Sequence, residues 1–125
     1  MALTRIYRVE TDDLRGMYAF QIGIYYSPKN NDRIDPAQHR PQPKRHIREH
    51  LMDVGDRSQH LFGFRNIEQV QRWIRNPTDF EFLSQNFKLS VYEIDETEIV
   101  EDENQLVYFH PKATLIERLP LNSAQ

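Results

Sequence analysis

The sequence lacks cysteine, holds only four glycines and has no long apolar run. Without cysteine there are no disulfide bonds and no thiol catalysis, and a secreted disulfide scaffold is a poor match. Four glycines leave no glycine-rich phosphate loop. No apolar stretch reaches the roughly 18 residues of a membrane-spanning helix, and the N-terminus lacks a signal-peptide pattern. We therefore expect no membrane span and a cytoplasmic location.

What is present suits one domain. The chain has 125 residues, near the commonest domain size, and seven Phe, six Tyr and one Trp supply area for a core. The net charge of −3 counts against general nucleic-acid binding. We expect a single domain over residues 1–125, with a long proline-rich loop at 27–43 and a tail at 120–125.

The stretch from 60 to 95 organises the chain. A short apolar strand leads to Asn66, a good N-cap residue, and Gln69 follows at the third helical position of a capping box. Apolar residues then recur at the spacing of one helix face: Ile67, Val70, Trp73 and Ile74. A strand over 87–94 follows, with Leu89 and Val91 on one face and Tyr92 and Ile94 on the other.

A second helix is expected after the break at Asn76-Pro77, with Pro77 at its first position and Asn86 at its end, and a short helix is expected over 44–52. Further strands are expected at 5–10, 17–26, 98–100, 105–110 and 113–119, with a turn at 102–104. The predicted fold class is α+β, with a mostly antiparallel sheet and two or three short helices.

Two arginines are candidates for binding an anion. Arg8 lies on the same strand face as Ile6, so it will be partly buried and must meet a negative group. That group is either a structural partner, Glu10 or the acidic C-terminal half, or a bound phosphate or carboxylate. Arg65 precedes the central helix, where backbone N–H groups attract anions, although plain capping is the more ordinary explanation of this position.

Charge is also unevenly distributed along the chain. Residues 40–48 hold four bases and no acid, whereas residues 93–103 hold seven acids and no base. The two segments either form two solvated surfaces or face each other, within a subunit or between subunits. The bases are candidate partner-binding residues: Arg40, Lys44, Arg45 and Arg48.

Four of the five histidines fall between 39 and 60: His39, His46, His50 and His60. Residues 46–50 match the H-x-x-E-H pattern of one class of zinc proteases, and on a helix both histidines would share a face. A zinc protease needs a third ligand and a larger fold around its cleft. We favour no metal here, and leave a metal or anion site at these histidines open.

Three segments carry a resemblance to the ADP-ribosyltransferase-like fold. Residues 7–10 (YRVE) resemble its first strand, residues 62–66 (FGFRN) its middle strand, and residues 103–111 (ENQLVYFHP) its late strand. The resemblance implies an NAD- or ADP-ribose-type ligand. Its implied contacts are a phosphate clamp at Arg8, a ring stack on Tyr25 or Phe64, and a ribose contact at Gln105. Arg65 is a further candidate for binding the same nucleotide.

The catalytic position departs from that family. Gln105 stands where its catalytic Glu is usual, and an amide supplies no charge to a developing cation. Glu103 is the only candidate acid, yet side chains two apart on a strand lie about 6.5 Å apart. Binding without turnover is therefore as well supported as catalysis, and whether the protein is an enzyme is left undecided.

The whole chain also resembles small uncharacterised proteins of phages and prophages, with residues 39–43 (HRPQP) matching their His-x-Pro loop. That resemblance brings no activity with it. Two functions are predicted: a nucleotide-binding protein of transferase-like fold, or a non-enzymatic phage accessory or anti-defence protein. The second would bind a host protein through its basic loop or acidic strand. A structural or homo-oligomeric module is the third reading.

Overall fold

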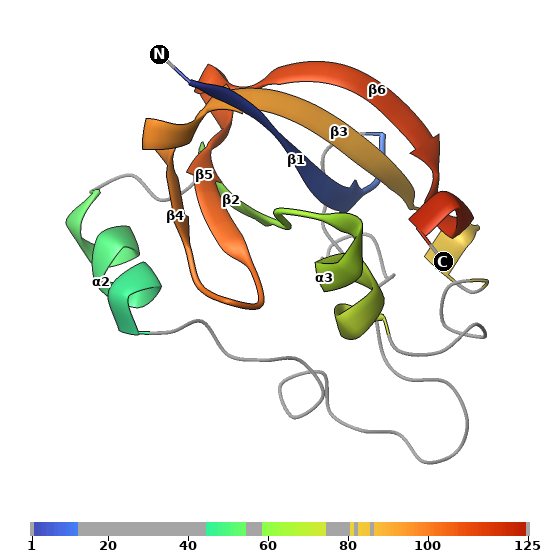
Figure 1. Ribbon diagram of the computed structural model, residues 1–125, viewed down its shortest axis with the longest axis horizontal. Helices are drawn as coiled ribbons and strands as arrows, with labels where there is room; N and C mark the ends of the chain where they lie inside the picture. The colour runs from blue at the N-terminus through green and yellow to red at the C-terminus, as the bar shows by residue number, and fades with distance from the viewer. Residues whose placement is uncertain are drawn as a thin grey trace.

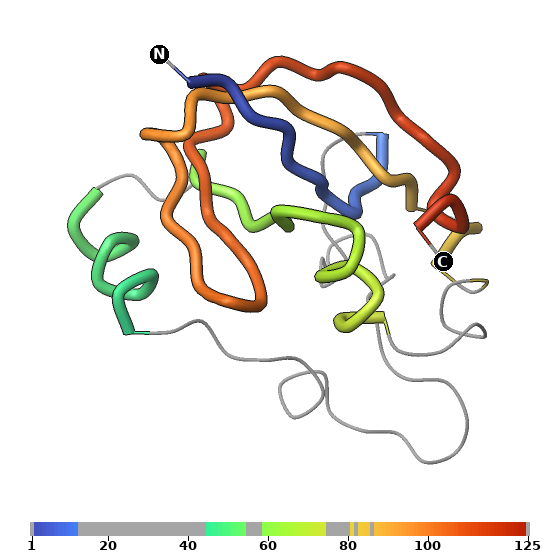
Figure 2. Tube along the Cα trace, in the orientation of Figure 1, coloured from blue at the N-terminus to red at the C-terminus, as the bar shows by residue number. Residues whose placement is uncertain are grey.

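The computed structural model describes residues 2–12, 45–54, 59–74, 81, 83–85 and 87–124. The strand expected at 17–26, the whole loop expected at 27–43 and most of the helix expected at 77–86 lie outside these ranges. Figures 1 and 2 show the path of the chain. The elements are, in order, β1 (Leu3–Glu10), α2 (Arg45–Asp53), β2 (His60–Gly63), α3 (Ile67–Trp73), β3 (Lys88–Asp95), η3 (Glu96–Glu98), β4 (Ile99–Glu101), β5 (Leu106–Phe109), η4 (His110–Lys112), β6 (Thr114–Pro120) and η5 (Leu121–Ala124).

The strands form two three-stranded antiparallel sheets, ordered β1-β3-β6 and β2-β5-β4. In Figure 1 the first sheet arches over the top of the molecule and the second stands beneath its left half. A bridge between Tyr7 and Phe64 joins them through two backbone hydrogen bonds of 2.8 and 2.7 Å. The predicted α+β class is confirmed, while an ADP-ribosyltransferase fold is not shown.

Strand alternation gives the first sheet two different faces. Val9 lies opposite Leu89, and both belong to a core cluster that includes α3. Ile6 lies opposite Tyr92, and both belong to a second cluster that includes β5 of the other sheet. The two faces predicted for residues 87–94 are confirmed, because Leu89 and Tyr92 separate into different clusters.

The predicted central helix is α3, and it packs on the first cluster. Val70, Trp73 and Ile74 are buried, and the ring of Phe64 meets that of Trp73 edge-on at 5.3 Å. The cap forms as predicted, since Asn66 Oδ1 accepts the N–H of Gln69 at 2.9 Å. The return bond differs from the standard capping box, because Gln69 Oε1 accepts from Arg65 N–H at 2.7 Å.

The predicted helix at 44–52 is confirmed as α2, which lies against the edge strand β4. Ile47 is its fully buried residue. His46 Nε2 donates to the backbone oxygen of Glu101 in β4 at 2.6 Å. An open edge strand invites pairing with other chains, so this contact helps to cover the edge. No helix in the described part of the chain has the length and apolar character needed to cross a membrane.

The chain's last residues are part of the core. The segment expected as a tail contains η5, in which Leu121 and Ala124 are buried in the first cluster. Pro120 is the last residue of β6, and Pro111 lies in η4.

Gly63 lies where the two sheets approach each other so closely that a side chain would be crowded. A Cβ atom there would lie 2.9 Å from the backbone oxygen of Tyr7, which accepts one bond of the sheet-joining bridge. We expect Gly63→Ala to lower the free energy of unfolding by about 1–3 kcal/mol, the usual cost of overpacking. Urea denaturation measures this, with Thr114→Ala on exposed β6 as the control. Unchanged stability in Gly63→Ala would contradict the packing described.

Candidate functional site

A charged pair lies buried between the two sheets. Glu10 is 0% exposed and Arg8 is 8% exposed. Arg8 Nε donates to Glu10 Oε1 at 2.8 Å, and its Nη1 donates to the backbone oxygen of Phe62 at 2.7 Å. The anion that Arg8 was expected to meet is therefore Glu10, as the structural alternative predicted. The same guanidinium links β1 to β2.

Two further strands complete the surroundings of Glu10. Its Oε2 accepts the hydroxyl of Tyr92 from β3, and Arg118 Nη2 from β6 lies 3.5 Å away. Arg118 Nε also donates to Ser90 Oγ at 3.2 Å. Ser90 stands opposite both Arg8 and Arg118 in the sheet, so the register itself gathers these groups. We call Arg8, Glu10, Ser90, Tyr92 and Arg118 the Glu10 network.

Burial keeps the phenols near this network neutral. Burial, followed by the hydrogen bond to Glu10, raises the pKa of Tyr92 to about 12. Burial likewise raises the pKa of Tyr108, whose hydroxyl lies 3.2 Å from Nδ1 of His110. Burial lowers the pKa of His110. Tyr92 is consequently a hydrogen-bond donor to Glu10 at neutral pH, and the network is suited to holding one buried carboxylate in place.

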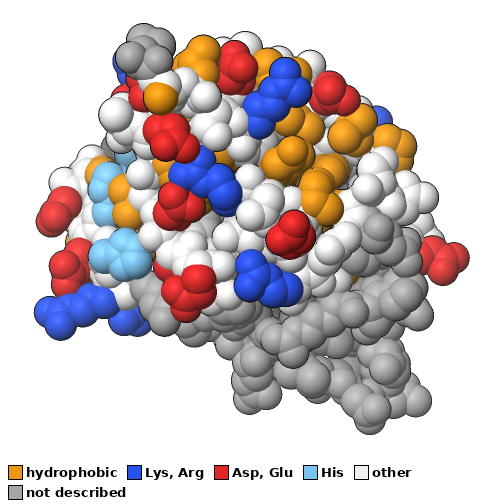
Figure 3. Space-filling model, viewed as in Figure 1, with side chains coloured by type: hydrophobic (Ala, Val, Ile, Leu, Met, Phe, Trp, Pro, Cys, Tyr) orange, Lys and Arg blue, Asp and Glu red, His pale blue; other side chains and the backbone are white. Residues whose placement is uncertain are grey.

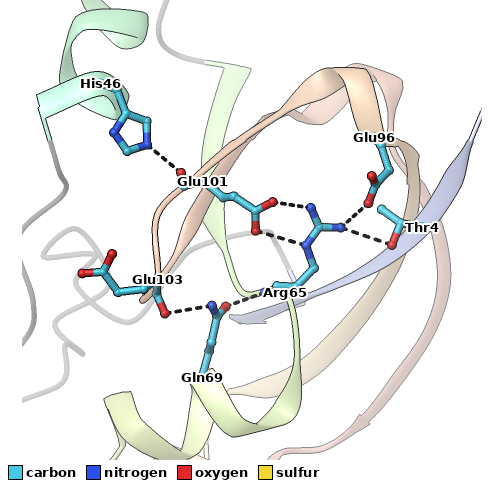
Figure 4. A network of polar contacts seen from close by, with 7 residues as sticks. All are labelled: Thr4, His46, Arg65, Gln69, Glu96, Glu101 and Glu103. Atoms are coloured by element: carbon cyan, nitrogen blue, oxygen red, sulfur yellow. Dashed lines mark hydrogen bonds and ion pairs between the residues drawn. The ribbon is translucent and has the colours of Figure 1, made fainter.

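Arg65 forms a second network nearer the surface, drawn in Figure 4. It grips Glu101 through two bonds, Nη2–Oε2 at 2.6 Å and Nε–Oε1 at 3.2 Å, and its Nη1 meets Glu96 Oε1 at 2.6 Å. Nη1 also donates to Thr4 Oγ1 at 3.3 Å. The hydrogen bond to Glu101 is the largest cause that raises the pKa of Arg65. Both carboxylates come from the acidic segment 93–103, so part of it faces a base from the chain's centre.

The other residues predicted to bind a nucleotide lie in several parts of the chain. Phe64 is 5% exposed and packs on Trp73, while Gln105 is 3% exposed and directly precedes β5. Arg8 lies in β1, which pairs with β3, whereas Gln105 directly precedes β5, which pairs with β2. Glu103 is exposed, and Figure 4 shows its carboxylate turned away from Arg65. Tyr25 lies outside the described residues.

The predicted partner-binding bases are divided between described and undescribed residues. Arg45 and Arg48 lie exposed on α2, and Arg45 pairs with Glu49 at 2.6 Å. Arg40 and Lys44 lie outside the described ranges. The helix touches the acidic segment through His46 and the backbone of Glu101.

Sequence reasoning missed Tyr92 and Arg118 as partners of Glu10, and Glu96 and Glu101 as partners of Arg65. A signal for the first set existed, because alternation places Arg8 and Glu10 on one face of their strand. That signal says that a buried charge needs partners, but only the pairing register identifies them.

We expect Glu10→Gln to lower the free energy of unfolding by about 3 kcal/mol, since breaking one side of a buried ion pair leaves the other uncompensated. The amide can still accept one bond, but its NH₂ group would face the donors Tyr92 and Arg118. Urea denaturation at pH 7 measures the loss. The exposed Glu117→Gln is the matched control, and equal stability of both variants would refute the role assigned to Glu10.

Comparison with known proteins identifies a family but no individual relative. Neither the curated proteins nor the solved structures include a match to this chain. The model of one family, described as Bacteriophage T4 Y00F protein, matches residues 1–122. This match covers nearly the whole sequence and confirms the resemblance to small phage proteins, whereas the resemblance to ADP-ribosyltransferases is not shown. The chain therefore belongs to the bacteriophage T4 Y00F protein family.

Proposed function

We propose that this phage protein is a non-enzymatic accessory protein that binds an acidic surface of a host protein through the outer face of α2. That face is defined by Arg45, Arg48 and Met52. The observation that supports the proposal most directly is the exposure of this face on a helix whose opposite side is fixed to the sheet. Such binding would serve the phage in an anti-defence role in the host cytoplasm.

The three residues form one stripe because they follow each other at i, i+3 and i+7. The Arg45 side chain is 86% exposed and Met52 is 76% exposed. On the opposite side, Ile47 is buried and His46 bonds to β4. A helix fixed in this way loses little conformational freedom when a partner binds its outer face.

The chemistry of the face indicates the kind of partner. An exposed arginine–glutamate ion pair such as Arg45–Glu49 contributes only about 0.3–0.5 kcal/mol to stability. A partner's carboxylates can therefore replace Glu49 at little cost. Guanidinium groups pair well with carboxylates, and a flexible methionine adapts to an apolar depression beside them. Arg40 and Lys44 precede the helix in sequence and would add to the same attraction.

The nucleotide-binding reading has weaker support from the described contacts. Arg8 and Arg65 already pair with carboxylates, and Phe64 packs against Trp73. A nucleotide phosphate would have to displace those carboxylates. The assignment of NAD-type binding to Arg8, Tyr25, Phe64, Arg65 and Gln105, with Glu103 as the acid, stays a prediction.

We expect the double variant Arg45→Glu/Arg48→Glu to lose a host protein that the wild-type protein captures from host extract. The captured protein, once purified, should bind the wild type less tightly as salt rises, because exposed charge attraction is screened within about 8 Å at physiological ionic strength. Stability should change little, since surface substitutions usually stay within about 0.5 kcal/mol. A Met52→Asp variant should weaken the same binding.

The matched control is Lys112→Glu, an exposed charge reversal on η4 rather than on α2. It should keep the binding. Equal capture by the wild type and the double variant, or no specific capture by the wild type, would overturn the proposal.

A further inference from the structure

We propose that His50 and His60 together bind one divalent transition-metal ion of the zinc type, which would join the end of α2 to the start of β2. This inference is independent of the proposed partner. It rests on the relative placement of two imidazole rings and on one buried nitrogen atom.

The two rings already lie at a distance that suits a shared ion. His50 stands in the last turn of α2 and His60 is the first residue of β2. Their ring centroids are 5.8 Å apart and the rings meet edge-on at 72°. A tetrahedral zinc ion with two nitrogen ligands at about 2.0–2.1 Å holds the two centroids roughly 5 Å apart. The observed separation is within about 1 Å of that value.

The imidazole of His60 contains one buried nitrogen atom. Among the described residues, Nδ1 of His60 is buried and finds no hydrogen-bond partner. Buried polar atoms are paired in the great majority of cases, and an unpaired one calls for a water, an ion or a functional reason. The ring of Phe109, with its centroid 5.0 Å away, restricts the plane in which this imidazole can turn.

The donor atoms select the class of metal. Neutral imidazole nitrogens suit zinc, copper and nickel, whereas magnesium and calcium prefer oxygen ligands. Within the described ranges, no group of three or more His, Cys, Asp or Glu is placed to hold a metal. With two histidine ligands and water in the remaining positions, the site would be weak and exchangeable rather than permanent and structural.

A metal ion at this position would restrain α2 at both of its ends together with His46. His46 fastens the first turn of the helix to β4, and the metal would fasten its last turn to β2. Figure 3 shows histidine side chains at the surface on the left of the molecule, the side on which Figure 1 places α2. His50 and His60 are both half-buried, so an ion could reach them from solvent and would hold the helix in one orientation.

Thermal unfolding of the untagged protein with and without 0.1 mM zinc chloride, roughly the concentration that saturates a weak site, tests the proposal. We expect zinc to raise the melting temperature by about 4 °C or more, because binding to the folded state alone stabilises it. EDTA should reverse the shift, while magnesium at the same concentration should produce none. The variants His50→Gln and His60→Gln should each lose most of it.

His46→Gln, on the same helix, is the matched control and should keep the shift. If His60→Gln does not fold, His50→Gln decides the question, and cobalt substitution provides an independent readout through the absorption of a tetrahedral nitrogen-bound ion. The proposal is overturned if zinc produces no shift, if His50→Gln keeps the full shift, or if His46→Gln loses it.

Discussion

The buried carboxylate of Glu10 is the constraint on which the arrangement of strands depends. A charge without access to water is stable only when donors surround it. Arg8 from its own strand, Tyr92 from β3 and Arg118 from β6 supply these donors. A shift of one residue in either pairing would turn the opposing side chains to the other face. The network therefore specifies one register for the first sheet, and Arg8 extends it to β2.

Pairing within the protein also limits which of its charges can bind another molecule. Arg8 and Arg65 are the two arginines that sequence reasoning assigned to a ligand, and both are engaged by the protein's own carboxylates. Their charge serves to connect strands. The cations available to another molecule in the described part of the chain include those on the outer face of α2. This distribution of charge is the reason for proposing a macromolecular partner rather than a nucleotide.

Local patterns predicted much of the fold. The cap at Asn66, the apolar stripe of α3 and the two-faced strand over 87–94 all depend on neighbours in sequence, and each is confirmed. The candidate site depends on contacts between distant residues, such as Tyr92 with Glu10 and Glu101 with Arg65. Periodicity says which face a side chain occupies, but pairing register and bulges decide which residue it meets. That is why a buried partner for Arg8 was predictable and the rest of the network was not.

A double-mutant cycle between Arg8 and Glu10 tests the central claim most directly. Arg8→Met, Glu10→Gln and the combined variant would be compared with the wild type by urea denaturation at pH 7. The account predicts a coupling energy of about 2 kcal/mol or more, because each single change leaves a buried charge without its partner and the double change removes both. A coupling energy near zero, with the two losses simply adding, would contradict it.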